Sequence, residues 1–387
     1  MKRGSTGRYE KSPAGGETVR AFIPAPLPPD PRLDLAGGRQ QLIERATLAL
    51  GRLDSITLLL PDPNLFLYAY VRREAVLSSQ IEGTQSSLSD LLLFELDDAP
   101  GAPIDAVVEV SNYVAALEHG LKRLRGDFPL SNRLLREMHK KLLSRGRGAK
   151  KSPGEFRRSQ NWVGGTRPGN AHFVPPPPQQ VESCMAALEH FIHDERAPYP
   201  VLVKAALVHV QFETIHPFFD GNGRVGRLLI ALMLHVADVL KQPLLYLSLY
   251  FKQHRAEYYR LLDKVRVDGD WEAWLDFFLE GVEQTASGAV ATAQALVKLF
   301  HEDAARILTL GRTATTTMRV FEAVRQRPVS TLKEISERTD LSFPAVSKAM
   351  ALLADLGIVR ELTGGKRNRV FAYHHYLALL SEGAEPL

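Results

Sequence analysis

Residues 216–227, which read His-Pro-Phe-Phe-Asp-Gly-Asn-Gly-Arg-Val-Gly-Arg, constrain the fold of this chain more than any other segment. The stretches on either side, 199–215 and 228–240, are helical by their length and composition. A glycine-rich loop therefore leads into the N-terminus of a helix, where unpaired N–H groups and the helix dipole favour an anion. The segment predicts a nucleotide site between two helices.

The loop and the first helical turn carry the groups that would bind phosphate. Gly221 and Gly223 permit backbone angles and a close approach that a Cβ would hinder, so their N–H groups can form an anion nest. Arg224 and Arg227 are three residues apart, which places both guanidinium groups on one face of the helix. Arginine binds phosphate by bidentate contacts that lysine cannot make.

Two side chains before the loop supply the reactive groups. Asp220 offers the carboxylate that Mg²⁺ needs when it bridges phosphate oxygens. His216 is placed to take a proton from an attacking hydroxyl. In the alternative interpretation, His-Pro-Phe is a helix stop with a packed aromatic ring and the arginines solvate a helix face. That alternative leaves the Asp-Gly-Asn-Gly-Arg run unexplained.

The composition restricts the class of protein. A chain of 387 residues with 45% hydrophobic residues can bury a full core and holds two or three domains. The single cysteine, Cys184, excludes an intramolecular disulfide framework and suits a reducing compartment. Residues 1–10 lack the apolar region of a signal peptide, and the run 228–240 is too short to span a bilayer. We expect a cytoplasmic protein without a membrane partner. The formal charge of +4 does not by itself indicate nucleic-acid binding.

Helical patterns dominate the first 310 residues. Residues 1–20 are rich in Gly, Ser and charge and are expected to be disordered, and 22–32 form a proline-rich arm. Asn64 is a candidate N-cap of the second helix. Helices are expected over 39–60, 64–81, from 87 onward, and over 104–125, 131–145, 179–194, 199–215, 224–239, 253–266, 270–285 and 288–310.

Glycines and prolines interrupt this pattern between residues 146 and 180. Within the interruption, two short runs that start at Asn161 and Ala171 flank a Pro-Gly turn. They predict a β-hairpin over 161–174.

The C-terminal part differs from the rest. A short helix over 318–325 precedes Thr331, which together with Glu334 forms a capping box at the start of a helix. A second helix over 342–353 and two strands around a basic turn follow. Helix, turn, helix and hairpin predict a winged helix-turn-helix module.

The sequence resembles the Fic family. Residues 216–227 match its signature, His-x-Phe-x-Asp/Glu-Gly-Asn-Gly-Arg-x-x-Arg, at every fixed position, and the similarity covers most of residues 20–285. The resemblance implies transfer of AMP from ATP to a protein Ser, Thr or Tyr hydroxyl (AMPylation), with ATP as co-substrate and Mg²⁺ as metal. It makes His216 the general base and Asp220 the Mg²⁺ ligand. The implied phosphate-binding residues are Gly221, Asn222, Gly223, Arg224, Val225, Gly226 and Arg227.

An inhibitory element is implied near residue 80. Ser78 and Glu82 are four residues apart on one helix face, Gly83 is a stop signal, and a carboxylate at a helix C-terminus is unfavourable. The run is similar to the family's inhibitory motif, Ser/Thr-x-x-x-Glu-Gly/Asn, in the subclass that carries it before the core. The resemblance implies that Glu82 pairs with Arg227 and occupies the space of the ATP γ-phosphate. In some members this glutamate also supports AMP removal. The alternative is an exposed glutamate at a helix end.

Residues 150–178 look like the family's flap, which pairs with an extended target segment by strand addition. The flap residues expected nearest the nucleotide are Val163, Gly164, Gly165 and Thr166. By resemblance Tyr258 aligns with a residue at the adenine, although an aromatic residue at this spacing also suits a core.

The tail leaves two interpretations open. The basic residues Lys366, Arg367 and Arg369 suit phosphate contacts, and Ser347 and Lys348 could read DNA from the second helix. The run 343–346 offers few base-reading groups, so DNA binding and protein docking both remain.

Together these patterns predict a mainly α protein, with a Fic-type helical core, a short β-hairpin flap and a C-terminal winged helix-turn-helix domain. The expected parts are a disordered tail (1–20), an N-terminal helical segment with the inhibitory helix (21–110), the catalytic core (111–285), a connecting helix (286–312) and the winged helix-turn-helix (313–387).

The predicted function is that of an autoinhibited protein adenylyltransferase, which modifies a target protein and itself and is able to form a homodimer. The alternatives are a DNA-binding regulator that uses the core as a nucleotide sensor, and a phosphotransferase like the related Doc branch. Doc proteins carry a bulkier Ala-Asn-Lys loop, so Gly221 and Gly223 favour AMP transfer.

Overall fold

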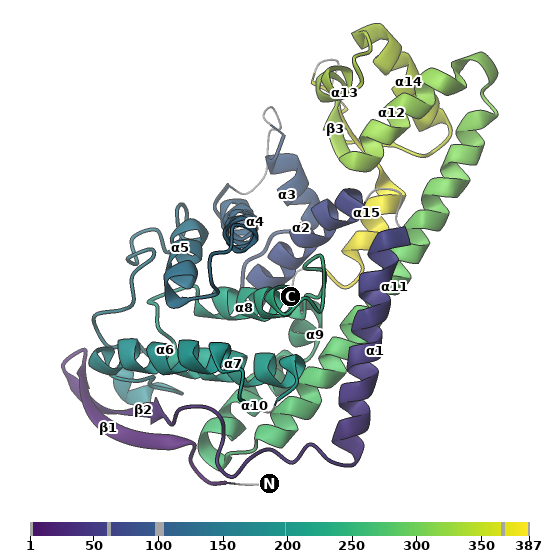
Figure 1. Ribbon diagram of the computed structural model, residues 1–387. Coiled ribbons are helices and arrows are strands. Elements are labelled where there is room, and N and C mark those ends of the chain that lie inside the picture. The colour runs from purple at the N-terminus through teal and green to yellow at the C-terminus, as the bar shows by residue number, and fades with distance from the viewer. Residues whose placement is uncertain (1–2, 60–62, 97–103, 198, 365–367, 386–387) are drawn as a thin grey trace. The chain divides into compact units, whose positions relative to one another are not determined.

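The chain folds mainly into α-helices, which the computed structural model describes over residues 3–59, 63–96, 104–197, 199–364 and 368–385 (Figure 1). It divides into two compact units. The first consists of Met1–Asp54 and Asn112–Ser287, and the second of Ser55–Ser111 and Gly288–Leu387. The helices α1 (Gly38–Leu59), α4 (Ile104–Arg125) and α11 (Trp271–Leu308) contribute residues to both units. The expected mainly helical fold class is confirmed.

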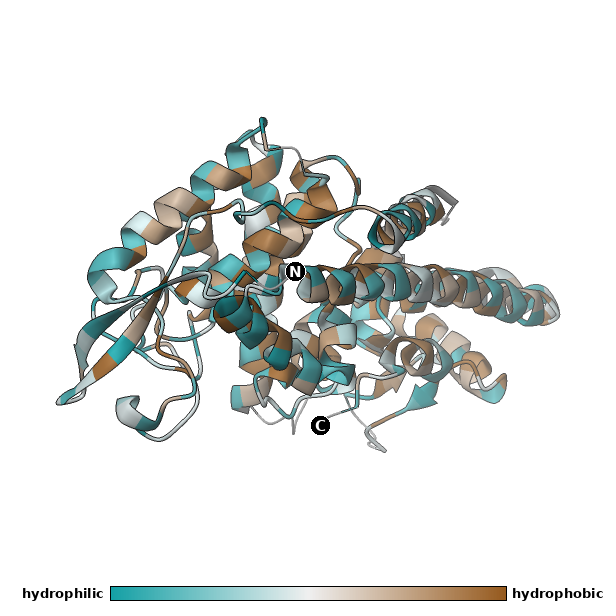
Figure 2. Cartoon of the chain, turned by 90° about the horizontal axis from the view of Figure 1, so that it is seen from below, coloured by the Kyte–Doolittle hydropathy of each residue, from teal (hydrophilic) through white to brown (hydrophobic). Residues whose placement is uncertain are grey.

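The first unit is built around the helix pair α7 and α8. Its elements are β1 (Gly7–Ala14), β2 (Glu17–Pro24), α5 (Asn132–Leu142), η1 (Pro168–Asn170), α6 (Pro178–His193), α7 (Val201–Ile215), α8 (Asn222–Val236), α9 (Ser248–Gln253) and α10 (Arg255–Asp268). Nearly every residue of α7 is buried, because α6, α8, α10 and β2 all pack against it. The other helices carry polar and apolar residues side by side, as amphipathic helices on a core do (Figure 2).

The second unit combines two N-terminal helices with the C-terminal elements. It contains α2 (Pro63–Ile81), α3 (Leu88–Phe94), η2 (Gly311–Thr313), α12 (Ala314–Gln326), β3 (Val329–Thr331), α13 (Leu332–Thr339), α14 (Phe343–Asp355), β4 (Arg360–Glu361), β5 (Val370–Ala372) and α15 (His374–Ser381). The three strands form an antiparallel sheet in the order β3-β5-β4. Both Thr331 with Glu334 and Ser87 with Asp90 form capping boxes, so these two helix starts follow the sequence prediction.

The expectation of a disordered N-terminus is wrong for residues 7–20, which form most of an antiparallel hairpin of β1 and β2. Gly15 and Gly16 connect the strands with φ angles of 56° and 82°, as a two-residue turn with two left-handed positions requires. Val19 and Phe22 of β2 are buried. The signal that could have indicated this hairpin is the Gly15-Gly16 pair between two segments of strand length.

Some helix boundaries also differ. The two helices expected over 270–285 and 288–310 are the single helix α11, and the one expected over 253–266 is replaced by α9 and α10. Asn64, the predicted N-cap, lies inside α2. A glycine inside a helix weakens it but does not by itself end it, and α11 continues through Gly288. A Cβ at Gly288 would meet no other atom within 4 Å, so no close packing requires glycine there. None of the described helices is long and apolar enough to cross a membrane.

Candidate active site

The predicted catalytic segment connects α7 to α8. His216 follows the last residue of α7 with a φ of 49°, and Gly221 precedes α8 with a φ of 77°. A Cβ on Gly221 would lie 3.2 Å from the Leu142 side chain, so this left-handed position suits only glycine. The two left-handed residues reverse the chain. The loop between them, residues 216–221, is called the catalytic loop below.

Asn222 holds the catalytic loop closed. The backbone N–H of Phe218 donates to Asn222 Oδ1 over 2.8 Å, and Asn222 Nδ2 donates to the carbonyl of Phe218 over 2.9 Å. Asn222 is 2% exposed. Sequence reasoning assigned Asn222 to the anion site. Its side chain fixes the loop, and its contact with an anion stays a prediction.

The first turn of α8 presents the phosphate-binding groups. The first N–H groups of an α-helix have no carbonyl partner within the helix, so the turn that begins at Asn222 is a favourable place for an anion. Arg224 and Arg227 rise from this turn and are 1% and 5% exposed. A Cβ on Gly226 would lie 2.5 Å from Glu213 Oε1, so glycine lets α7 and α8 approach closely. Buried guanidinium groups beside the N-terminus of a helix favour an anionic ligand.

Asp220 lies next to these arginines. Arg224 Nη2 donates to Asp220 Oδ1 over 3.3 Å, and the Asp220 side chain is 30% exposed. No group of three or more His, Cys, Asp or Glu side chains that could enclose a metal occurs among the described residues. Mg²⁺ commonly binds one or two carboxylates together with phosphate oxygens of its substrate. A single, partly exposed carboxylate beside a phosphate site fits a Mg²⁺ ion that arrives with a nucleotide.

The side chain of His139 in α5 supports the catalytic loop by a hydrogen bond and a ring contact. The N–H of Gly154 donates to His139 Nδ1 over 2.8 Å, so the proton of the neutral ring is on Nε2, which donates to the carbonyl of Asp220 over 3.0 Å. The imidazole stacks on Phe218 with 3.8 Å between ring centroids. Burial lowers the pKa of His139 to about 4, so the ring stays neutral at physiological pH.

A second buried histidine, His209 of α7, holds the start of α8. Its Nδ1 donates to the carbonyl of Gly226 over 3.1 Å, so its Nε2 accepts a hydrogen bond from the Tyr258 hydroxyl over 2.9 Å. Burial lowers the pKa of His209 to about 3. Tyr258 is 1% exposed and stacks on Phe251 within the core. This placement favours the core interpretation of Tyr258 over a contact with adenine.

Arg157 anchors the end of α7. Its guanidinium group is buried and donates through Nε to the carbonyl of His216 over 2.9 Å and through Nη2 to the carbonyl of Pro176. Its backbone N–H donates to the carbonyl of Pro217 over 2.9 Å. Burial lowers the pKa of Arg157 to about 10, so it remains a cation at neutral pH. Arg157 thus holds the carbonyl of the predicted base, His216, and that of the residue after it.

The predicted hairpin over 161–174 exists as one bridged pair rather than two strands. Val163 and Phe173 exchange backbone hydrogen bonds of 2.8 and 3.1 Å. The turn contains η1, and Asn170 Oδ1 accepts from the N–H of Thr166 over 3.0 Å. Gly164 and Gly165 have positive φ angles. This segment, residues 161–174, is called the flap below.

The flap is tied to the catalytic loop. Asn161 Nδ2 donates to the carbonyl of Phe218 over 3.0 Å. The flap residues that were predicted nearest the nucleotide, Val163, Gly164, Gly165 and Thr166, follow this anchor directly. Their contact with a nucleotide stays a prediction.

The residues predicted for inhibition lie in the second unit. Ser78 is fully buried in α2, which ends at Ile81. The N–H of Glu82 donates to Ser79, and Gly83 follows with a φ of 92°, so the helix stops where the sequence indicated. Arg227 belongs to the first unit, and the pairing of Glu82 with Arg227 stays a prediction.

The expected DNA-binding residues are only partly described. Ser347 and Lys348 lie on α14, whose first residue, Phe343, is 55% exposed. Arg369 donates to Glu361 over 2.6 Å, and this hydrogen bond lowers the pKa of the Glu361 carboxyl. Part of the charge of Arg369 is therefore already balanced. Lys366 and Arg367 lie outside the described residues.

Sequence reasoning missed three supporting side chains, His139, Arg157 and His209. Each stands in a segment whose local pattern reads as an ordinary helix or loop, and each acts on a carbonyl group far away in the chain. A buried polar residue is visible as such only once burial is known.

Two family models match the chain. Residues 40–122 match the model described as Fic/DOC family N-terminal, and residues 129–234 match the model described as Fic/DOC family.

Proteins named protein adenylyltransferase Fic are among the curated relatives. The relative from Drosophila grimshawi is 32% identical over 48% of this chain and 35% of its own length. The relative from Culex quinquefasciatus is 33% identical over 53% of this chain and 39% of its own length. The chain thus spans less than half of these relatives.

Solved structures share the fold. A Fic family protein from Desulfovibrio desulfuricans G20 has a TM-score of 0.58 at 18% identity, over 88% of this chain and 97% of that one. Fic-1 from C. elegans, residues 134–508, has a TM-score of 0.51 at 22% identity, over 67% of this chain and 73% of that one. At these identities the likeness concerns the fold alone.

Proposed function

We propose that the chain transfers AMP from ATP to a hydroxyl group of a target protein, a proposal that starts from its matches to the Fic/DOC family model over residues 129–234 and to the family's N-terminal model over residues 40–122. The observation that carries the proposal is the arrangement around the catalytic loop. One buried helix turn brings a helix N-terminus together with Arg224 and Arg227, and Asp220 and His216 lie at the same end of the helix pair. Curated relatives bear the name protein adenylyltransferase Fic.

In the proposed reaction the target hydroxyl oxygen forms a bond to the α-phosphorus of ATP, and the bond from that phosphorus to the bridging oxygen of the β-phosphate breaks. Pyrophosphate leaves, and the hydroxyl proton goes to His216. The N–H groups of residues 222–224 and the two arginines stabilise negative charge on the phosphates. Mg²⁺, held by Asp220, would neutralise phosphate charge when bound. Arg157 and Asn222 keep the loop in the conformation that places His216.

The flap positions the target segment that carries the acceptor hydroxyl. In this proposal its bridged pair presents an open backbone edge to an extended target segment, which aligns the hydroxyl with the α-phosphate. A segment of a second copy of the chain can bind in the same way, which gives auto-AMPylation.

We test the transfer with ATP labelled at either the α- or the γ-phosphate. Label from α-labelled ATP should appear on protein, and His216→Ala should reduce it by about 100-fold or more, because general-base catalysis typically contributes that much. Transfer of γ-label instead would support the Doc-like phosphotransferase. The absence of any transfer, combined with salt-dependent duplex binding, would support a DNA-binding regulator. Duplex binding is tested because the elements α12 to β5 occur in the order expected for a winged helix-turn-helix.

The proposed state is autoinhibited, with Glu82 paired to Arg227. Because this pair would occupy the space of the γ-phosphate, Glu82→Gly should increase auto-AMPylation from α-labelled ATP. An unchanged rate would remove the inhibitory assignment while leaving the transfer activity intact. The same glutamate could support AMP removal, which the release of AMP from pre-labelled protein would measure in the wild-type protein and in Glu82→Gly.

A further inference from the structure

The N-terminal arm, residues 3–34, contacts the flap through its β1–β2 hairpin, and no part of the function described above uses it. We propose that this arm is a positioning element, which holds the flap in the orientation that receives a target segment. The inference rests on the proposed function of the flap. It concerns contacts within the first unit only.

The arm covers one edge of the flap. The N–H of Phe22 in β2 donates to the carbonyl of Val174 over 2.9 Å. In an extended strand, successive residues direct their backbone polar groups to opposite sides. Phe173 pairs with Val163 on one side, so Val174 pairs with β2 on the other. This hydrogen bond joins one side of the flap to the β1–β2 hairpin, so in the proposal an incoming strand adds on the other side, beside residues 161–166.

Side chains of the arm reinforce this edge. Ser12 Oγ donates to Gln160 Oε1 over 2.9 Å, and Gln160 Nε2 donates to the carbonyl of Pro175 over 2.9 Å. Arg167 at the flap turn forms an ion pair of 2.8 Å with Glu17. Arm and flap also share an apolar cluster of Ala14, Val19, Ala21, Val174 and Ala171.

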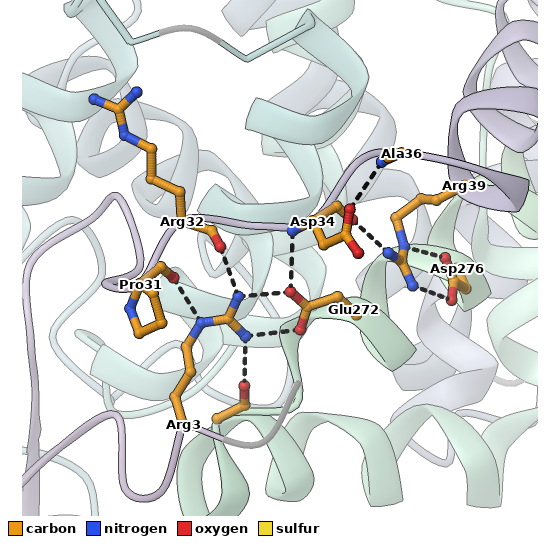
Figure 3. A network of polar contacts seen from close by, with 9 residues as sticks. Arg3, Pro31, Arg32, Asp34, Ala36, Arg39, Glu272 and Asp276 are labelled. Carbon is orange, nitrogen blue, oxygen red and sulfur yellow. Dashed lines mark hydrogen bonds and ion pairs between the residues drawn. The ribbon is translucent and has the colours of Figure 1, made fainter.

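The other end of the arm is fixed to the core of the first unit (Figure 3). Arg3 donates to both carboxylate oxygens of Glu272 at 2.7 and 2.6 Å, and the two side chains are 4% and 5% exposed. Burial alone would raise the pKa of Glu272, but the hydrogen bonds from Arg3 and from the N–H of Asp34 lower it to about 2. Arg3 also donates to the carbonyls of Pro31 and Arg32 and thus ties both ends of the arm together.

Strand β1 continues from this anchor toward the flap. The N–H groups of Gly4 and Thr6 donate to the carbonyls of Asp268 and Arg266 at the end of α10. The Arg266 guanidinium lies over the Phe173 ring at 4.0 Å from its centroid. The flap is therefore held at Asn161 by the catalytic loop and at residues 173–174 by the arm and α10. With both ends held, the arm sets the angle at which the flap projects.

The test uses hydrogen exchange of the full-length protein, which needs no catalytic activity. The double variant Arg3→Gln with Glu272→Gln removes the anchor without leaving a buried unpaired charge. We expect the amides of Val163 and Phe173 to exchange about tenfold faster or more, while α7 and α8 keep their protection. The control Arg45→Gln breaks the exposed pair of Arg45 with Glu283 in the same unit and should leave the flap unchanged.

A milder variant keeps the proposal testable if the first variant fails to fold. Ser12→Ala with Glu17→Gln removes only the contacts of the arm to Gln160 and Arg167, and should also accelerate exchange in the flap. Unchanged flap exchange in both variants would overturn the proposal. If the flap loosens and the KM for the target protein rises while the KM for ATP stays the same, the arm acts through target positioning. If the flap loosens in a protein that transfers no AMP, the arm inference survives and the proposed function fails.

Discussion

The catalytic loop and the flap are both short irregular segments next to α7 and α8, but they are held in different ways. Buried side chains bind the loop at alternate carbonyl groups, with Arg157 at His216, Asn222 at Phe218 and His139 at Asp220. The flap is held by one bridged pair, by one contact to the loop, and by contacts to the β1–β2 hairpin and to Arg266 of α10. Groups that act on the same phosphates in every turnover need a fixed geometry, whereas a segment that binds protein targets needs an open backbone edge.

The largest effect should come from breaking the loop. Arg157→Met leaves the buried carbonyls of His216 and Pro176 without their donor, which should lower the free energy of unfolding by about 4 kcal/mol. The rate of AMP transfer at saturating ATP should fall about 100-fold, because His216 loses its fixed position. Urea denaturation and the α-label assay measure the two effects. A folded variant that transfers AMP at the wild-type rate would show that this anchor is not needed.

The second effect concerns pH and the histidine that holds α8. The pKa of His209 falls from 6.5 in the unfolded chain to about 3 in the folded protein. The unfolded state therefore binds more protons between these values, so the contribution of His209 is complete above pH 6.5 and is lost as the pH falls toward 3. At pH 4.5 the loss should be about 3 kcal/mol. Thermal unfolding measured between pH 7 and 4.5 should show a smaller decrease in His209→Gln, and an equal decrease would contradict this account.

The smallest effect should come from the flap. Gly165 has a φ of 72°, and a Cβ there would lie 2.5 Å from the carbonyl oxygen of Asn170. Gly165→Ala should distort the turn at a local cost of about 1 kcal/mol or more. We expect the KM for a target protein to rise about fivefold and the thermal unfolding temperature to change little. Gly37→Ala, which adds a methyl group to open space at a φ of 63° outside the arm and the flap, is the matched control for a positive φ. A large loss of stability in Gly165→Ala alone would show that the flap is as integral to the core as the loop.

Much of the candidate site was predictable because it is local. Asp220, the arginines and the glycines lie within twelve residues, and helix caps such as Thr331 with Glu334 involve residues three positions apart. The contacts of the Asn222 amide with the N–H and the carbonyl of Phe218 were not predictable, because the positions of these groups are set only in the folded protein. The role of Tyr258 was ambiguous from the sequence, because an aromatic residue with a hydroxyl suits either a ligand pocket or a buried contact such as the one to His209.

The sequence by itself determined the order of chemical groups in the catalytic segment, because a glycine turn, a helix N-terminus and side chains three or four residues apart are set by short-range geometry. The tertiary structure decided what holds that segment and what holds the flap. Arg157 acts on a carbonyl 59 residues away, and Ser12 on a side chain 148 residues away. Such pairs depend on the burial and packing of the whole unit, and a polar residue in an ordinary local pattern carries no sign of its distant partner.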